Sequence, residues 1–228
     1  MATEQPLVVA AAPDAGLAVR TPLAVRGLIE APSSGVATRD LAYLQRLPDT
    51  ADEIRDIAAT TGADTARDIF LGPAANEQTV KTFALTRYRV IAFATHGLVS
   101  GDLTGLTEPV LALSAPSAAH VDGDGLLTLE EVLGLRLNAD WVVLSACNTA
   151  SGNGSGSEAL SGLGRAFFYA GARALLVSNW PVETTAARVL TTDLFRRQQR
   201  DPRLSRAHAL QQTLDQMIDK GGHVDTST

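Results

Sequence analysis

The stretch DWVVLSACNTASGNGSG, residues 140–156, decides the fold that the sequence predicts. Its run Trp141–Leu144 is apolar and rich in β-forming residues, as expected for a strand covered on both faces. The run closes with Ser145-Ala146-Cys147, and glycine, asparagine and serine then crowd into a stretch that no regular element tolerates well. Cys147, the only cysteine of the chain, therefore follows the carboxyl end of a buried strand, where open α/β sheets place ligands and chemistry.

A second apolar strand with a polar end is expected upstream. Residues 89–95 read RVIAFAT and are followed by His96 and Gly97. If the two strands are parallel neighbours, His96 and Cys147 lie together at one edge of the sheet. Their spacing of 51 residues is typical of caspase-type nucleophile sites. The backbone N–H groups of Gly97 and Cys147 are then candidate oxyanion donors.

Length, composition and charge bound the class of protein. The 228 residues are 45% hydrophobic and 19% charged, which suits one α/β domain with a substantial core. We expect a single domain over residues 1–228, with an irregular part at 1–43 and a polar tail at 221–228. One cysteine and an N-terminus without a basic region predict a cytoplasmic protein. No apolar run approaches a membrane span, and a net charge of −6 without a basic patch argues against nucleic-acid binding.

Strands alternate with helices along the chain, which predicts an α/β fold with a mainly parallel sheet and helices on both faces. Besides the two strands above, short strands are expected at 7–12, 66–71, 110–113 and 174–177. Helices are expected at 49–61, 76–85, 128–133, 157–170, 183–199 and 204–218. Loops are expected at 13–38, 98–108 and 114–125.

Two further motifs resemble ligand-binding sequences. The segment 120–131 contains HVDGDG and resembles a Ca²⁺ loop, but the helix that should precede it is missing. We therefore predict a turn that opens the helix at 128–133, and no metal site. The pattern G-x-G-x-x-A at 154–159 is a short dinucleotide signal, which keeps a nucleotide-binding α/β domain as an alternative. We predict no cofactor.

Three blocks of the sequence resemble the CHAT domain, a caspase-like domain often found with tetratricopeptide repeats. They are IAFATHG (91–97), LLTLEEVLGLRLNADWVVLSACNTASG (126–152) and EALSGLGRAFFYAGARALLVSNWPV (158–182). The resemblance covers roughly residues 44–199 and implies a relative of caspases, separase and gingipains. It implies a cysteine endopeptidase with His96 and Cys147 as its dyad, and oxyanion donors at the Gly97 and Cys147 amides.

In this interpretation Cys147 attacks the scissile carbonyl and His96 assists proton transfer to the leaving amine. Trp180 and Glu183 follow the strand expected at 174–177, so we predict that they line the pocket for the P1 side chain. A carboxylate there favours arginine or lysine at P1, as the separase and gingipain resemblance also implies.

A competing interpretation places Glu183 in the first turn of the helix at 183–199, where acids are favoured. CHAT domains commonly carry a second acid after W-P-V, and this chain has Thr184 there. If Glu183 does not line the pocket, Glu158 and Asp102 are the next candidates.

The expected partners are a protein or peptide substrate and a regulatory protein, with no nucleic acid and no membrane. The regulator would order the loops at 98–108 and 152–156 beside the site, because glycine-rich loops can switch between ordered and disordered forms. The sequence leaves open a proteolytically silent CHAT domain that serves as an interaction module.

Overall fold

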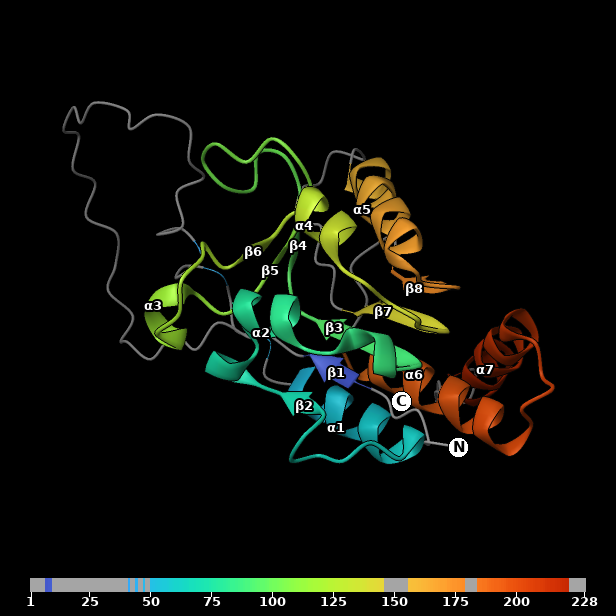
Figure 1. Ribbon diagram of the computed structural model, residues 1–228. Helices are drawn as coiled ribbons and strands as arrows, with labels where there is room; N and C mark the ends of the chain where they lie inside the picture. The colour runs from blue at the N-terminus through green and yellow to red at the C-terminus, as the bar shows by residue number, and fades with distance from the viewer. Residues whose placement is uncertain are drawn as a thin grey trace, which may run out of the picture.

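The centre of the molecule is a parallel sheet. The structure is a computed structural model, and it describes residues 7–9, 41, 44, 47, 50–145, 156–178 and 184–221. Within these residues five strands pair in the order β2-β1-β3-β7-β8, and every pairing is parallel (Figure 1). The strands are β1 (Leu7–Val9), β2 (Ile69–Phe70), β3 (Val90–Ala94), β7 (Trp141–Ser145) and β8 (Leu175–Val177). The predicted mainly parallel α/β fold is confirmed.

A smaller antiparallel sheet continues directly from β3. It consists of β4 (Gly97–Leu98), β5 (Val110–Ala112) and β6 (Leu126–Leu127) in that order. The sequence predicted only β5, since strands of two residues carry no readable alternation. The prediction of a loop at 114–125 missed the short helix α3 (Pro116–Ala119).

Helices cover both faces of the parallel sheet, as predicted. On one face lie α1 (Thr50–Thr61) and α6 (Thr184–Arg200), with α7 (Arg206–Gly221) packed against α6. On the other face lie α2 (Glu77–Thr82), α4 (Leu129–Gly134) and α5 (Gly156–Ala170). In Figure 1, α5 lies above the sheet and α1 and α6 lie below it. None of the described helices combines the length and the apolar composition needed to cross a bilayer.

Side-chain caps set two of the helix starts. The Asn76 side chain accepts a hydrogen bond from the Thr79 N–H at 2.8 Å, which begins α2. Thr128 and Glu131 form a reciprocal capping box at the start of α4, and such caps satisfy N–H groups that have no partner within the helix. The sequence extended α2 to residue 85, whereas it ends at Thr82.

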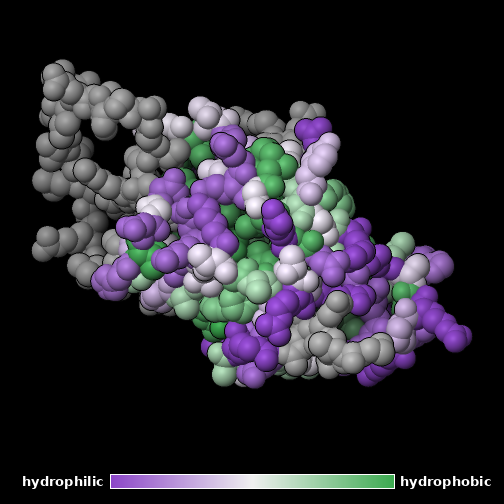
Figure 2. Space-filling model, viewed as in Figure 1, coloured by the Kyte–Doolittle hydropathy of each residue, from purple (hydrophilic) through white to green (hydrophobic). Residues whose placement is uncertain are grey.

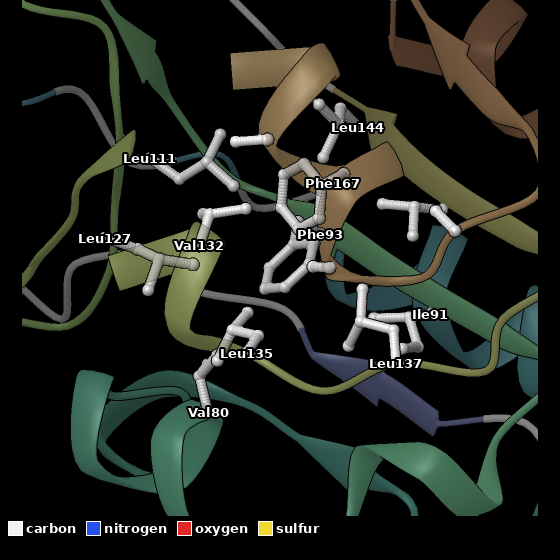
Figure 3. Close-up of a cluster of buried hydrophobic side chains, with 14 of the residues drawn as sticks. Val80, Ile91, Phe93, Leu111, Leu127, Val132, Leu135, Leu137, Leu144 and Phe167 are labelled. Atoms are coloured by element: carbon white, nitrogen blue, oxygen red, sulfur yellow. The ribbon is translucent and has the colours of Figure 1, made fainter. Parts of the chain in front are cut away.

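The two central strands divide their side chains between two cores. Ile91 and Phe93 of β3 pack with α5 on one face, and Ala92 of β3 packs toward α1 and α6 on the other. Figure 3 shows Phe93 against Phe167 at the middle of the first core, with ring centroids 5.6 Å apart. Both strands are buried along their whole length, which fits the continuous apolar runs in the sequence.

Gly171 connects α5 to β8 where two backbone segments approach closely. Its φ is +117°, and an added Cβ would lie 2.3 Å from the Leu137 carbonyl oxygen. The Leu137 N–H donates to the Ala170 carbonyl at 2.8 Å, so this backbone cannot withdraw without losing a hydrogen bond. We predict that Gly171→Ala lowers the free energy of unfolding by about 2–5 kcal/mol through backbone strain and overpacking, measured by urea denaturation.

Gly62→Ala is the matched control for this prediction. Gly62 also has a positive φ, +78°, but no heavy atom lies within 4 Å of its added Cβ. This variant should show the backbone strain alone, about 1–2 kcal/mol. Equal losses in the two variants would contradict a specific steric role for the Leu137 carbonyl.

Candidate functional site

The carboxyl ends of β3 and β7 form the edge at which the sequence places its candidate residues. The two strands are parallel neighbours, as predicted, and their last register pair is Ala94 with Ser145. The Thr95 N–H donates to the Ser145 carbonyl at 3.3 Å, which extends the pairing by one hydrogen bond. His96 follows directly at the junction of the two sheets.

His96 is buried, with 4% of its surface exposed. Hydrogen bonds with Ala112 hold the chain at Thr95 and at His96, where β3 turns into β4. The Ala112 N–H donates to the His96 carbonyl at 2.9 Å, and the Thr95 hydroxyl donates to the Ala112 carbonyl. Gly97 pairs with Leu111 in the antiparallel sheet. Regular secondary structure therefore fixes the backbone at His96. A catalytic side chain needs such accurate placement.

A buried carboxyl group lies under this edge, and the sequence analysis missed it. Glu53 of α1 is fully buried and accepts a hydrogen bond from the Ser145 hydroxyl at 2.8 Å. The Thr191 hydroxyl of α6 lies 3.2 Å from the other carboxyl oxygen of Glu53. One carboxyl group thus connects the last residue of β7 to two helices. The sequence does contain a signal for this buried acid: Glu53 lies four residues before Ile57, on the apolar face of α1.

Burial raises the pKa of Glu53, while the hydrogen bonds from Ser145 and Thr191 and the positive charge of Arg188 lower it. Burial is the largest of these effects, since a low dielectric disfavours the charged form. The hydrogen bonds of Thr191 are compatible with a neutral Glu53. The Thr191 hydroxyl can donate to the Ala187 carbonyl at 3.0 Å and accept a hydrogen bond from a protonated Glu53.

A small cavity of about 210 Å³ adjoins Ser145 on the same side of the sheet. Most of its walls are apolar side chains of β7, β8, α6 and α7, including Leu144, Leu176, Leu190, Leu210 and Leu214. Its polar side chains are Ser145, Ser178 and Thr191, and two of these hydrogen-bond to Glu53. This volume is below that of most whole-ligand sites, so the cavity suits a single side chain.

Several predicted site residues lie outside the described part of the chain. These are Cys147, Trp180 and Glu183, together with the loop at 152–155. Asp102 is described, and its carboxylate accepts a hydrogen bond from the Val99 N–H at 2.8 Å. Asp102 therefore closes its own loop, which makes it a poorer candidate for binding a substrate cation.

The Ca²⁺-like segment is a turn that packs on α2. Glu77 accepts hydrogen bonds from the N–H groups of Asp124 and Gly125 at 3.0 and 3.2 Å. Lys81 pairs with both Glu77 and Glu131. Asp124 and Glu131 of this segment thus take part in hydrogen bonds and an ion pair that hold the entry to α4. Among the residues that the structure describes, no group of three His, Cys, Asp or Glu side chains is arranged to hold a metal ion.

Comparison with known proteins gives two findings. A family model described as CHAT domain matches residues 2–225. Tetratricopeptide repeat protein 28 of Mus musculus is 42% identical to this chain over 64 residues, which are 28% of this chain and 3% of that protein. The chain is therefore similar to a small part of a much longer relative.

The raised pKa of Glu53 predicts a pH-dependent stability. Because its pKa in the folded state lies above the ordinary value of 4.5, the folded protein binds more protons than the unfolded chain between the two values. The stability contributed by protonated Glu53 is therefore present at low pH and is lost as the pH rises through the raised pKa. Glu53→Gln cannot ionise, so its stability relative to wild type should increase across this window.

Urea denaturation over a pH series measures the free energy of unfolding of wild type and of Glu53→Gln. Taking the difference between the two proteins removes the contribution of other titrating groups. Glu53→Ala serves as the control for the hydrogen bonds. It leaves the Ser145 hydroxyl without this partner and should be about 1–3 kcal/mol less stable than Glu53→Gln at every pH, since neither variant ionises at this position. A difference between Glu53→Gln and wild type that does not change with pH would contradict the assignment.

Proposed function

The chain belongs to the CHAT domain family, and we propose that it is a cysteine endopeptidase with His96 and Cys147 as its dyad. CHAT domains are related to caspase-like cysteine peptidases. The observation that carries the proposal is the register of β3 and β7, in which Ala94 pairs with Ser145. His96 and Cys147 each follow this pair by two positions in the sequence.

Chain geometry supports a dyad at this edge. Neighbouring strands of a sheet lie about 4.8 Å apart. Two residues carry the chain at most about 7 Å from the last paired position. A histidine and a cysteine that follow paired residues by the same number of positions can thus both reach one scissile peptide bond. The proposed reaction uses these two side chains and needs no metal or cofactor.

In the proposed reaction, the Cys147 thiolate attacks the scissile carbonyl carbon and forms a tetrahedral intermediate. The N–H groups of Gly97 and Cys147 would stabilise its oxyanion. His96, which has taken the proton of the Cys147 thiol, delivers it to the leaving amine as the C–N bond breaks, and water then hydrolyses the acyl-enzyme and frees the Cys147 thiol. Glu53 touches none of the reacting atoms, so it would act as a positioning residue through Ser145.

We further propose that the enzyme cleaves after a basic residue, with Trp180 and Glu183 at the pocket for the P1 side chain. The support is that β8 neighbours β7 in the sheet, so residues that follow either strand leave from the same edge. Glu53 is the described acid at this edge, but it is buried and bonded to two hydroxyl groups. An acid that pairs with a substrate cation must be able to reach it, which favours Glu183.

Three coarser assignments complete the proposal. We propose that residues 1–228 form one domain, that the protein acts in the cytoplasm, and that a regulatory protein controls access to the site. The single cysteine supports a reducing compartment. The loop from 99 to 109, which follows β4, and the chain from 146 to 155 flank the proposed site in sequence, where a partner could act on both.

Cys147→Ala and His96→Ala should both abolish steady-state peptide cleavage without unfolding the protein. A peptide acyloxymethyl ketone should label Cys147 in wild type, and His96→Ala should slow this labelling by about 10²–10⁴-fold. The double variant should be no worse than Cys147→Ala, because the two residues act as one unit. Mass spectrometry of the labelled protein and circular dichroism are the measurements.

His208→Ala is the matched control, since His208 is exposed on α7 and should leave labelling unchanged. Turnover that survives in Cys147→Ala would refute the nucleophile assignment. A correctly folded wild-type protein that is neither labelled nor active, with or without candidate partners, would favour the silent interaction module.

A library of peptides with varied P1 residues tests the proposed specificity. We predict that arginine and lysine are preferred at P1. Glu183→Gln should lower kcat/KM for arginine substrates by about 10–100-fold, the loss expected for a charge-assisted hydrogen bond. Glu53→Gln should leave the P1 preference unchanged. A preference for aspartate would remove Glu183 from the pocket, and an arginine preference that survives Glu183→Gln would direct attention to Glu158 and then to Asp102.

A further inference from the structure

A second cavity, here called the Asp140 cavity, opens at the end of the sheet opposite the proposed peptidase site. Its volume is about 780 Å³. Val90 and Trp141, the first residues of β3 and β7, form its base, and the end of α1, the end of α6 and residues 202–207 form its walls. Cavities of this size hold small organic ligands, so there is room for a molecule and not only for an ion.

One carboxylate faces several guanidinium groups at this cavity. Asp140, with 19% of its side chain exposed, pairs with Arg89 through Oδ2. Arg173 Nη1 lies 3.4 Å and Arg206 Nη2 lies 3.6 Å from Asp140 Oδ1. Three guanidinium groups thus pair with one carboxylate, on a chain whose net charge is −6.

Arg203 adds another guanidinium to the lining. Its backbone N–H donates to Asp201 Oδ1 at 3.0 Å. Its side chain forms no hydrogen bond or ion pair with the part of the chain that the structure describes. A guanidinium presents five N–H donors in a planar fork that matches the oxygens of a phosphate group. Arg203 therefore offers a complete fork to a ligand.

Neutral donors accompany these cations. Gln198 Oε1 accepts the Trp141 Nε1–H at 2.8 Å, which leaves the amide NH₂ of Gln198 as a donor. The helix α7 begins at Arg206, with the Ser205 hydroxyl accepting the His208 N–H at 3.3 Å. Among the described residues of the lining, Asp140 is the one acid.

Figure 2 shows hydrophilic side chains gathered over α6 and α7, at the right of the view.

We propose that the Asp140 cavity binds a small phosphorylated molecule through Arg203 and Arg206. Planar forks and a surplus of positive charge select a phosphate group over a neutral one. The volume leaves room for the organic part of the molecule. This site goes beyond the peptidase proposal and does not depend on it, because the cavity lies at the opposite ends of the same two strands.

Thermal unfolding of the whole chain with pyrophosphate and with ADP tests the proposal in phosphate-free buffer at about 0.1 M salt. Ligand at about 100-fold above Kd should raise Tm by roughly 5–10 °C. Arg203→Gln and Arg206→Gln should each weaken binding by at least about tenfold, the loss expected for a charge-assisted hydrogen bond. The Tm of Arg203→Gln without ligand should equal that of wild type, which separates a ligand-binding role from a structural one.

Arg55→Gln is the matched control. It removes the same charge from a surface pair with Asp52 on α1, and it should bind both probes like wild type. The proposal is overturned if neither probe raises Tm, or if Arg55→Gln weakens binding as much as Arg203→Gln. Equal affinity for citrate would refute the phosphate assignment. Equal affinity for a long single-stranded oligonucleotide would refute a small-molecule site.

Discussion

The pairing of β3 with β7 is the constraint on which the rest of the structure depends. Every residue of both strands is buried, so their backbone groups cannot turn to water and must bond within the sheet. Their side chains alternate between the two cores. A slip of one position would exchange these two sets and move Phe93 away from Phe167. Packing on both faces therefore fixes the register, and with it the relative positions of the strand ends.

Because the middle of this pair is apolar on both faces, polar chemistry is confined to its two ends, and the ends differ. At the amino ends the N–H groups of Asp140 and Trp141 both donate to the Arg89 carbonyl, and charged side chains meet around the partly buried carboxylate of Asp140. At the carboxyl ends the carboxyl group of Glu53 is fully buried and meets hydroxyl groups. The first arrangement attracts anions from solution, whereas the second holds the protein's own backbone in place.

Much of the fold could be predicted from the sequence, because long apolar runs and helical periodicity are local signals. The strand at 89–95, its parallel neighbour and the helix at 49–61 were read correctly in this way. The strands β4 and β6 could not be read, since two residues show no period. The partners of Glu53 lie 92 and 138 residues away in sequence, and Arg89 and Arg173 lie 51 and 33 residues from Asp140. Side-chain groups assembled by the fold leave no pattern in the chain, although an acid on an apolar helix stripe marks where to look.

The position of Glu53 shows how the candidate site is anchored. Burying an ionisable group costs free energy that a glutamine would not cost, so this carboxyl does not stabilise the fold by its charge. An apolar side chain in its place would leave Thr191 with the Ala187 carbonyl as acceptor, but it would leave the Ser145 hydroxyl without its described partner. The structural role of Glu53 is therefore to hold Ser145, the last residue of β7, in place. The chain that continues toward Cys147 starts from a residue held by β3 through Thr95 and by α1 through Glu53, so its point of departure is fixed on two sides.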